Sequence, residues 1–178
     1  KHNKIFITYG KGLFMTPSDF SVTFSDILEH EFFYHELPEH LKEDFYAQNV
    51  TISINFNFGW HVNDSLFGVK TTISYKYPSE QGWFPMLAYE SSTVFKIDNM
   101  LDYLTIMGDK NFDMQEDLLR HVLQLTTSTA RGILAVKTAG TPLAKIYLPV
   151  ITTIEFIAPE QQAPEQVVVS DASVQVSE

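Results

Sequence analysis

The sequence contains no cysteine, and that absence removes several kinds of chemistry at once. Without cysteine there is no disulfide framework, no thiolate nucleophile and no cysteine-based metal site. A chain of this kind suits a reducing compartment, because disulfides are used mainly in oxidising ones. The absence of cysteine therefore fits a cytoplasmic protein without establishing that location.

Basic residues are scarce, with 12 Lys and Arg against 22 Asp and Glu, so the formal net charge is −10. Binding to nucleic acid needs clustered Lys and Arg to neutralise phosphates. The charge therefore argues against a nucleic-acid partner. It is compatible with high solubility or with attraction to basic surfaces.

Long apolar runs are missing as well. The apolar stretch within residues 1–10 is too short for the core of a signal peptide. No other stretch approaches the length of a membrane-spanning helix, so we expect no membrane insertion. What is present is a chain of 178 residues with 44% hydrophobic content, enough for one domain with a core of its own.

Strand-like alternation dominates the first half of this chain. From residue 50 to residue 62, apolar and polar side chains alternate, which is typical of a strand with one buried face. Turn-forming residues 63–65 lead to a returning strand at 69–77, and a third strand is predicted at about 84–97. An earlier strand begins near Phe20 and continues irregularly towards Tyr34. These segments predict an antiparallel sheet.

Helix signals follow the strands. Asp98 can cap a short helix that places Met100, Leu101, Leu104 and Met107 on one side and ends at Gly108. A capping box of Asp113 and Glu116 predicts the start of a long helix. Its apolar stripe is formed by Leu119, Val122, Leu123, Ala130, Ile133 and Leu134, and it ends before Gly140 and Thr141.

The order of these elements predicts an α+β fold, in which a four-stranded antiparallel sheet carries a short and a long helix packed on one face. We divide the chain into an N-terminal extension at 1–19, an α+β domain at 20–158 and a tail at 159–178. The tail contains four acidic residues, no basic residue and no aromatic residue. Such a composition predicts a flexible acidic segment.

Three groups of polar residues were considered as chemical sites. His30, His35 and His40 are spaced five apart, which matches neither helix nor strand periodicity, so we expect no metal site. No nucleophile motif places a serine beside a histidine, and Arg131 near the helix C-terminus suits the helix dipole. We therefore expect no enzyme activity and no cofactor.

The glycines and the acidic pair give no site either. Gly10 and Gly12 follow an apolar run, but Met15 stands where a dinucleotide fingerprint requires glycine. Asp113 and Glu116 have the spacing of paired carboxylates, which helix capping explains better.

Aromatic residues are abundant, with 14 Phe, 8 Tyr and 2 Trp. One small sheet covered by two helices has only one buried face, and some aromatic area should remain outside it. We therefore expect either an oligomer interface or an apolar binding groove.

Residues 49–150 resemble the SecB export chaperones and their SecB-like relatives. The resemblance rests on an ordered set of short features rather than on one motif. These features are Phe95-Lys-Ile97 at the end of the third strand, Ala130-Arg131 in the long helix, Gly140-Thr141 after it, Leu148-Pro149-Val150, and Phe33-Tyr-His-Glu-Leu-Pro38 upstream.

The resemblance implies a cytosolic holdase that keeps polypeptides unfolded, has no cofactor and assembles as a homotetramer, a dimer of dimers. Two features depart from the family pattern. Residues 151–157, where the family has a further helix, are short, β-branched and followed by Pro159. The acidic surface that docks a translocase motor is matched by Glu36, and we add Glu90 to it, but Ala88 stands where an acid is expected.

Two hypotheses follow. In the first, the chain is a SecB-like chaperone that binds unfolded polypeptides, with a translocase motor or a toxin–antitoxin protein as a possible partner. The residues assigned to its groove, or to the core beneath it, are Ile52, Ile54, Phe56, Trp83, Phe84, Leu123 and Leu148. In the second, the chain is a small-ligand-binding α+β domain without catalysis, in which sheet and helix enclose a pocket.

Overall fold

The computed structural model describes residues 20–107 and 111–149. The predictions for the extension at 1–19 and the tail at 159–178 lie outside these residues, as does the end of the predicted domain from 150 to 158. The described part is a mixed α+β fold built on one large antiparallel sheet and one main helix.

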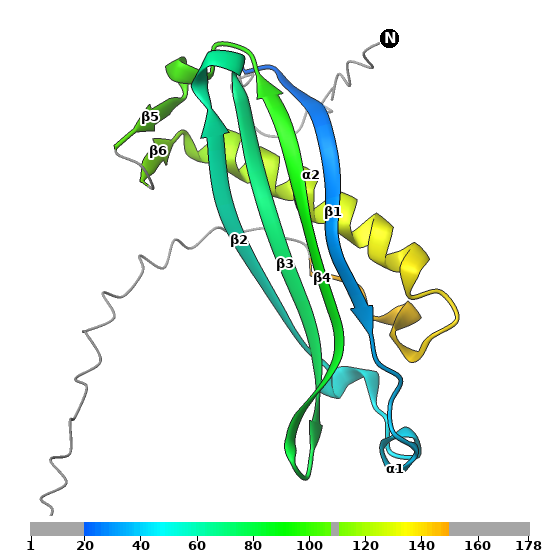
Figure 1. The fold of residues 1–178 in the computed structure, drawn as a ribbon. Helices are drawn as coiled ribbons and strands as arrows, with labels where there is room; N and C mark the ends of the chain where they lie inside the picture. Colours follow the sequence, from blue (N-terminus) through cyan, green and yellow to red (C-terminus); the bar gives the residue numbers. More distant parts are fainter. Residues whose placement is uncertain (1–19, 108–110, 150–178) are drawn as a thin grey trace, which may run out of the picture.

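Four long strands form the sheet in the order β1-β4-β3-β2, and all neighbours run antiparallel (Figure 1). All four predicted strands are confirmed. Their bounds are β1 at Val22–Tyr34, β2 at Thr51–His61, β3 at Leu66–Ser79 and β4 at Gly82–Ile97.

The alternation predicted for β2 has the expected structural cause. The β2–β3 pairing runs without irregularity from Thr51 opposite Lys76 to His61 opposite Leu66. Because side chains alternate across a strand, every second residue of β2 reaches the covered side of the sheet. These residues are Ile52, Ile54, Phe56, Phe58 and Trp60, and all are half-buried.

Strand β1 is irregular, as its sequence predicted. Its register with β4 shifts between Phe24 and Asp26 and again between Glu29 and Glu31. Each shift is a β-bulge, which inserts an extra residue and bends the strand. The bulges explain why the alternation that begins at Phe20 does not continue to Tyr34.

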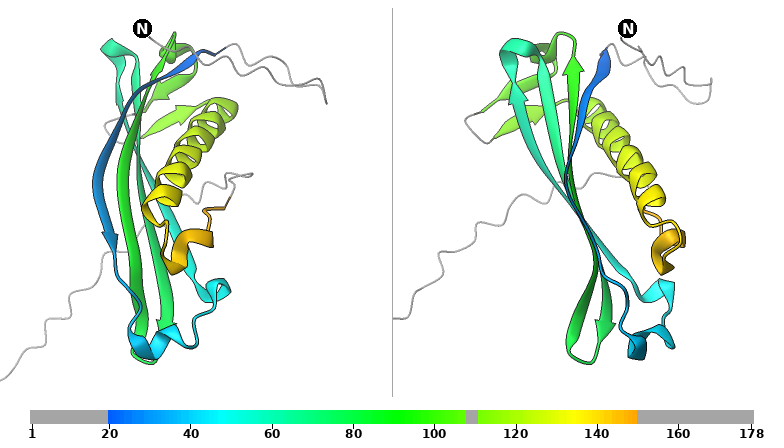
Figure 2. Two further views of the ribbon diagram at one scale, coloured as in Figure 1. Left: turned by 90° about the vertical axis from the view of Figure 1, so that its right-hand side faces the viewer. Right: turned by 45° about the vertical axis from the view of Figure 1, so that its right-hand side comes forward.

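One face of the sheet is crossed diagonally by α2, which spans Glu116–Lys137 (Figures 1 and 2). We call this side the helix face and the other side the open face. The predicted long helix is confirmed, but its capping box is wrong. Asp113 lies in a strand opposite Thr105, and the residue before the helix, Gln115, makes no side-chain capping bond.

The predicted short helix at 98–108 is also wrong. Met100–Asp102 forms a single 3-10 turn, η3, and Leu104–Ile106 forms a strand, β5, which pairs with β6 at Phe112–Met114. Four apolar residues at helical spacing are too few to overcome the cost of helix nucleation. The β-branched Thr105 and Ile106 favour an extended backbone, and pairing with β6 supplies its hydrogen bonds.

Short elements complete the described chain. They are α1 at Glu39–Lys42 and the 3-10 turns η1 at Ala47–Asn49, η2 at Val62–Asp64 and η4 at Pro142–Lys145. Among the described residues no helix has the length and apolar content needed to cross a membrane.

The core between α2 and the helix face consists of two apolar clusters. The first half of α2 packs on a cluster around Phe67, and Ala130 and Leu134 in the second half pack on a cluster around Tyr75. Thr71 of β3 and Thr126 and Thr127 of α2 are buried at the positions in sequence between the two clusters. Their hydroxyls have no hydrogen-bond partner among the described residues, so these positions stabilise the fold less than the apolar clusters do.

Candidate functional site

The strongest candidate surface lies on the helix face of β2. Ile52 and Ile54 pack against the Tyr75 cluster, and Phe56 packs against the Phe67 cluster. All three side chains are only half-buried, in contrast to their fully buried partners on β3. They therefore form an apolar row at the edge of the core that another chain can still contact.

Two of the residues assigned to this surface lie inside the core. Leu123 of α2 is 3% exposed in the Phe67 cluster, and Leu148 is 3% exposed in the Tyr75 cluster. Their sequence positions were compatible with either the groove or the core, and both side chains are buried in the core. Neither can contact a bound molecule without a local opening of the fold.

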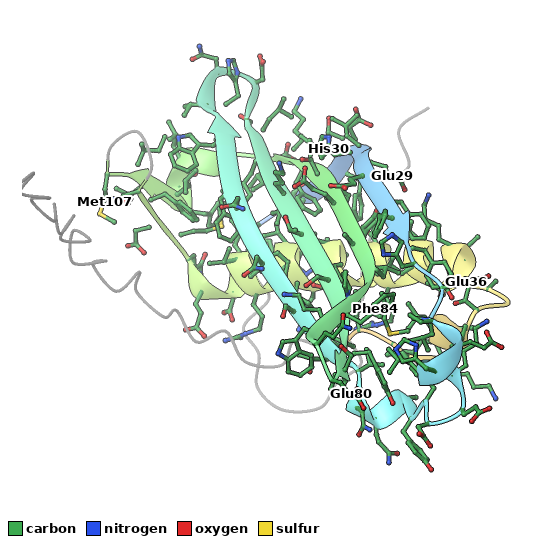
Figure 3. All side chains as sticks on the ribbon, turned by 60° about the horizontal axis from the view of Figure 1, so that its bottom comes forward. Glu29, His30, Glu36, Glu80, Phe84 and Met107 are labelled. Carbon is green, nitrogen blue, oxygen red and sulfur yellow. The ribbon has the colours of Figure 1, made fainter. Side chains whose placement is uncertain are left out.

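Trp83 and Phe84 begin β4, directly after the tight turn that joins it to β3. They behave differently. Trp83 is 59% exposed, whereas Phe84 is half-buried against the Tyr75 cluster. The ring of Phe84, which is labelled in Figure 3, lies 6.0 Å from the ring of His35, and the His35 ring in turn lies 3.9 Å from the ring of Phe33. Trp83 is thus the accessible member of the pair.

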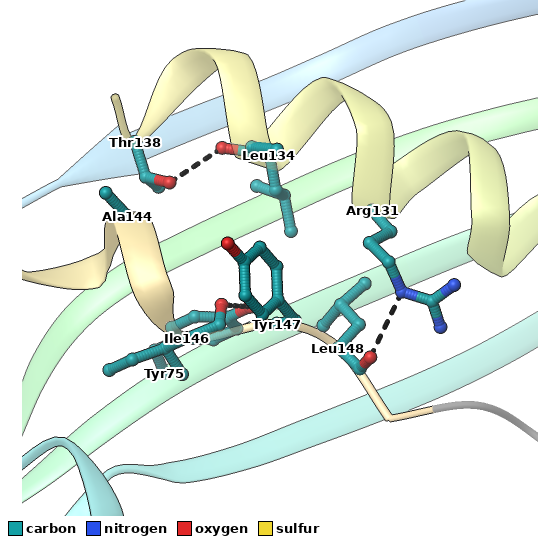
Figure 4. A pocket seen from close by; sticks show the side chains of 9 residues that line it. Tyr75, Arg131, Leu134, Thr138, Ala144, Ile146, Tyr147 and Leu148 are labelled. Atoms are coloured by element: carbon teal, nitrogen blue, oxygen red, sulfur yellow. Dashed lines mark hydrogen bonds between the residues drawn. The ribbon is translucent and has the colours of Figure 1, made fainter. Parts of the chain in front are cut away.

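An extended segment at residues 146–149, which we call the strap, crosses the helix face beside the Tyr75 cluster (Figure 4). The hydroxyl of Tyr75 donates to the carbonyl of Ile146 at 3.3 Å. Arg131 of α2 donates from Nε to the carbonyl of Leu148 at 3.1 Å. Burial raises the pKa of Tyr75 to about 12, so this donor keeps its proton further into the alkaline range than an exposed tyrosine does.

No ligand-sized chamber lies between sheet and helix at these positions. The space beside the strap, between Tyr75 and Arg131, has a volume of only about 10 Å³. A second hollow, lined by Tyr34, Glu36 and Pro142 among others, has about 250 Å³ and is open to solvent. Pockets for small ligands usually enclose about 300–1,000 Å³. Neither space suits the small-ligand hypothesis.

The two acidic residues assigned to partner docking occupy different environments. Glu90 lies on the open face, where its carboxylate pairs with Lys70 at 2.7 Å and accepts from Thr72 at 3.5 Å. The hydrogen bond from Lys70 lowers the pKa of Glu90. Glu36 is exposed beyond the end of β1, beside the 250 Å³ hollow. Because Glu90 is already paired, it offers less free charge to a partner than its sequence position suggested.

The three histidines lie in different surroundings. His30 shares a hydrogen bond of 2.7 Å with Ser92, His35 makes an edge-to-face contact with the ring of Phe33, and His40 lies in α1. Within residues 20–107 and 111–149, no group of three or more potential ligands has a geometry that could hold a metal ion.

Several apolar residues that the sequence pattern did not single out are exposed. Ile27 and Leu28 on β1 are 44% and 46% exposed, and Val136 near the end of α2 is 78% exposed. Leu101 and Met107, assigned to a helix, are each 62% exposed around β5. For Ile27 and Leu28 the sequence does carry a signal of exposure. Acidic residues beside them interrupt the alternation of apolar and polar residues, which is typical of a strand segment that is not buried.

Comparison with known proteins adds little to this description. No family model matches the chain, and no curated protein matches it. One similar solved structure is the Mycobacterium tuberculosis Rv1957 SecB-like chaperone in complex with a ChAD peptide from the Rv1956 HigA1 antitoxin. It has 16% identity and a TM-score of 0.42, over 72% of this chain and 90% of that chain.

Another similar structure is a protein of unknown function from Streptococcus agalactiae. It has 10% identity and a TM-score of 0.34, over 78% of this chain and 100% of that chain. At these identities and TM-scores, neither structure carries an argument about the function of this chain.

Proposed function

We propose that this chain is a SecB-like holdase, a chaperone that binds unfolded or non-native polypeptides and prevents their aggregation. The observation that carries the proposal is the row of half-buried apolar side chains at Ile52, Ile54 and Phe56, next to an outer edge of the sheet. An apolar row at a sheet edge suits an extended chain better than a compact ligand.

The expected affinity also suits a holdase. Each apolar side chain that a client covers contributes on the order of 1 kcal/mol, because only the exposed half of its area is removed from water. Three such contacts give weak and sequence-tolerant binding. A holdase needs this kind of contact, repeated over a long client, rather than one tight pocket.

The proposal includes assembly and location. We propose a cytoplasmic homotetramer, because the exposed apolar side chains of β1, β5 and α2 leave more apolar surface than one protomer covers. Its clients are general export substrates handed to a translocase motor, or a dedicated toxin–antitoxin partner.

The test is suppression of aggregation. A globular protein unfolded in guanidinium is diluted into buffer, with and without this protein, and light scattering is followed. We expect stoichiometric amounts to suppress the scattering. Ile54→Thr should weaken protection several-fold, since threonine keeps strand propensity but removes apolar contact.

Val94→Thr is the matched control. Val94 is also half-buried and β-branched, but it lies on the open face opposite Gly68. Its substitution should leave protection unchanged. If the unmodified protein gives no protection at any ratio, the holdase proposal is wrong.

The small-ligand hypothesis predicts a different combination of results. Such a protein should stay near its monomer mass of 20.3 kDa and leave the unfolding client unprotected. Light scattering at micromolar concentration, combined with the aggregation assay, separates the two functions.

A further inference from the structure

Alternate residues of β2 direct their backbone N–H and C=O groups outward, away from β3. Which residues do so follows from the pairing of the central strands β3 and β4. In an antiparallel pair, residues that exchange backbone hydrogen bonds alternate with residues that do not. The amide of Ile97 donates to the carbonyl of Ser65 at 2.9 Å. The residues of β3 that lie an even number of positions from Ser65 therefore form their backbone hydrogen bonds with β4.

The turn end of the β3–β4 hairpin gives the same assignment of hydrogen bonds. Ser79 and Gly82 flank the two-residue turn, and a turn of that length is closed by a hydrogen-bonded pair. The odd-numbered residues of β3 thus bond to β4, and its even-numbered residues bond to β2. Their partners on β2, such as Ser53 opposite Ser74 and Asn55 opposite Thr72, direct their backbone groups inward.

It follows that Ile52, Ile54 and Phe56 direct their backbone N–H and C=O groups outward. Among the described residues no strand pairs with this edge of β2. The same three residues place their half-buried side chains on the helix face. Backbone hydrogen-bonding groups and apolar contact area are therefore presented by the same positions.

This edge also lacks the features that usually block strand addition. Between Thr51 and Trp60 there is no charged residue and no proline, and the register is unbroken. The opposite edge strand, β1, has two bulges and carries Asp26, Glu29 and Glu31. Charges and bulges protect natural edge strands from pairing with other chains. Only one of the two edges of this sheet is protected in this way.

We propose that the edge of β2 binds an extended polypeptide segment as an added antiparallel strand. The segment is uncharged or basic, and its apolar residues occupy alternate positions opposite Ile52, Ile54 and Phe56. In that register the apolar residues of the client both exchange the backbone hydrogen bonds and share the helix face. The inference rests on the proposed function and names the class of segment that the holdase takes.

The structure favours a client over a second copy of this chain as the occupant. The proposed assembly uses the exposed apolar side chains of β1, β5 and α2, which leaves the edge of β2 to a client, and the formal charge of −10 favours a neutral or basic segment there. The accessible length is short. The ring of Phe112 of β6 lies 5.3 Å from the rings of both Phe58 and Trp60, so within the part of the chain that the structure describes, residues 51–57 are the uncovered part of the edge.

Three peptides of identical sequence test which residues of the bound segment exchange backbone hydrogen bonds with β2. In each peptide, Val and Ser alternate between flanking Lys residues. One has an unmodified backbone, one is N-methylated at every Val, and one is N-methylated at every Ser. Binding of each labelled peptide to the full chain is measured by fluorescence anisotropy. We expect Val methylation to weaken binding about tenfold or more, because it removes the donors that face β2. Ser methylation should change it little.

Each other outcome has a distinct meaning. Equal binding of all three peptides would show contact through side chains alone, and loss on Ser methylation only would show another edge or register. Both results overturn the inference and leave the holdase proposal intact. Client protection without any peptide binding also overturns the inference, whereas absence of both defeats the proposed function itself.

A variant tests whether a second copy occupies the edge instead. Asn55→Lys, which adds a charge beside the edge, should leave the mass in light scattering unchanged. A reduced mass would show that a second copy pairs there.

Discussion

Arg131 and Leu148 are joined by a hydrogen bond of 3.1 Å from the guanidinium Nε to the backbone carbonyl. A second bond, from Nη2 to the carbonyl of Pro149, measures 2.9 Å. From its sequence position near the helix C-terminus, Arg131 was expected to stabilise the helix dipole. Its role is structural, but it consists of fastening the strap to α2 through two carbonyl groups.

Replacing Arg131 with alanine should loosen the strap. The loss of two charge-assisted hydrogen bonds is expected to lower the free energy of unfolding by about 1–3 kcal/mol. Chymotrypsin should then cut faster after Tyr147, whose side chain is 62% exposed. Arg131→Lys keeps the charge but not the paired donors of the guanidinium group. Its stability and its cleavage rate should therefore lie between those of the unmodified protein and of the alanine variant. Unchanged stability and cleavage would show that the strap is held by Leu148 packing alone.

Trp83 and Phe84 should respond differently to substitution. Trp83→Ser removes a side chain that is 59% exposed, so we expect nearly unchanged thermal stability and weaker client protection. Phe84→Ser removes contacts with the Tyr75 cluster, so we expect lower stability. Melting temperature and aggregation suppression are measured on the same preparations. Full protection by Trp83→Ser would remove Trp83 from the client surface.

Leu123 and Leu148 should behave as core residues. Alanine at either position is expected to lower the free energy of unfolding by about 2–5 kcal/mol, measured by urea denaturation. The control is Ile52→Ala, which should cost less because that side chain is only half-buried. If Leu123→Ala were as mild as Ile52→Ala, the contact between α2 and the Phe67 cluster would be looser than described.

The sequence predicted the sheet well because alternation is a local signal with one main interpretation. In β2 each apolar residue is followed by a polar one, and an amphipathic strand at a sheet edge produces that pattern. The irregular part of β1 was located as well. Its bulges, between Phe24 and Asp26 and between Glu29 and Glu31, could not be placed from the sequence, since they depend on the register with β4.

The failures have a tertiary cause. The residues from Asp98 to Met107 have helical spacing, but pairing between β5 and β6 determines their conformation. Asp113 has the position of a capping residue, but the same pairing takes it into a strand. Burial of Leu123 and Leu148 depends on how α2 and the strap cross the sheet, which periodicity does not specify. The outward direction of the backbone groups of Ile52, Ile54 and Phe56 follows only from the strand order and the strand register.

Alkaline pH should destabilise the fold through Tyr75. Its pKa is raised to about 12 by burial, above the unfolded value near 10. The stabilising contribution is fully present below the unfolded pKa and is lost as pH rises from about 10 towards 12, because the unfolded chain releases the proton first. Tyr75→Phe should therefore lose less stability than the unmodified protein between pH 9 and pH 11, about one unit to either side of the unfolded value. Parallel urea titrations check this, and equal losses would contradict it.

Hydrogen exchange at single amides of β2 tests the central claim most directly. In the free protein, the amides of Ser53 and Asn55 should exchange slowly, because they bond to β3, whereas those of Ile52, Ile54 and Phe56 should exchange fast. Addition of an unfolded client should slow exchange at Ile52, Ile54 and Phe56. If these three amides remain fast with client bound, the edge of β2 is not where this protein holds its clients.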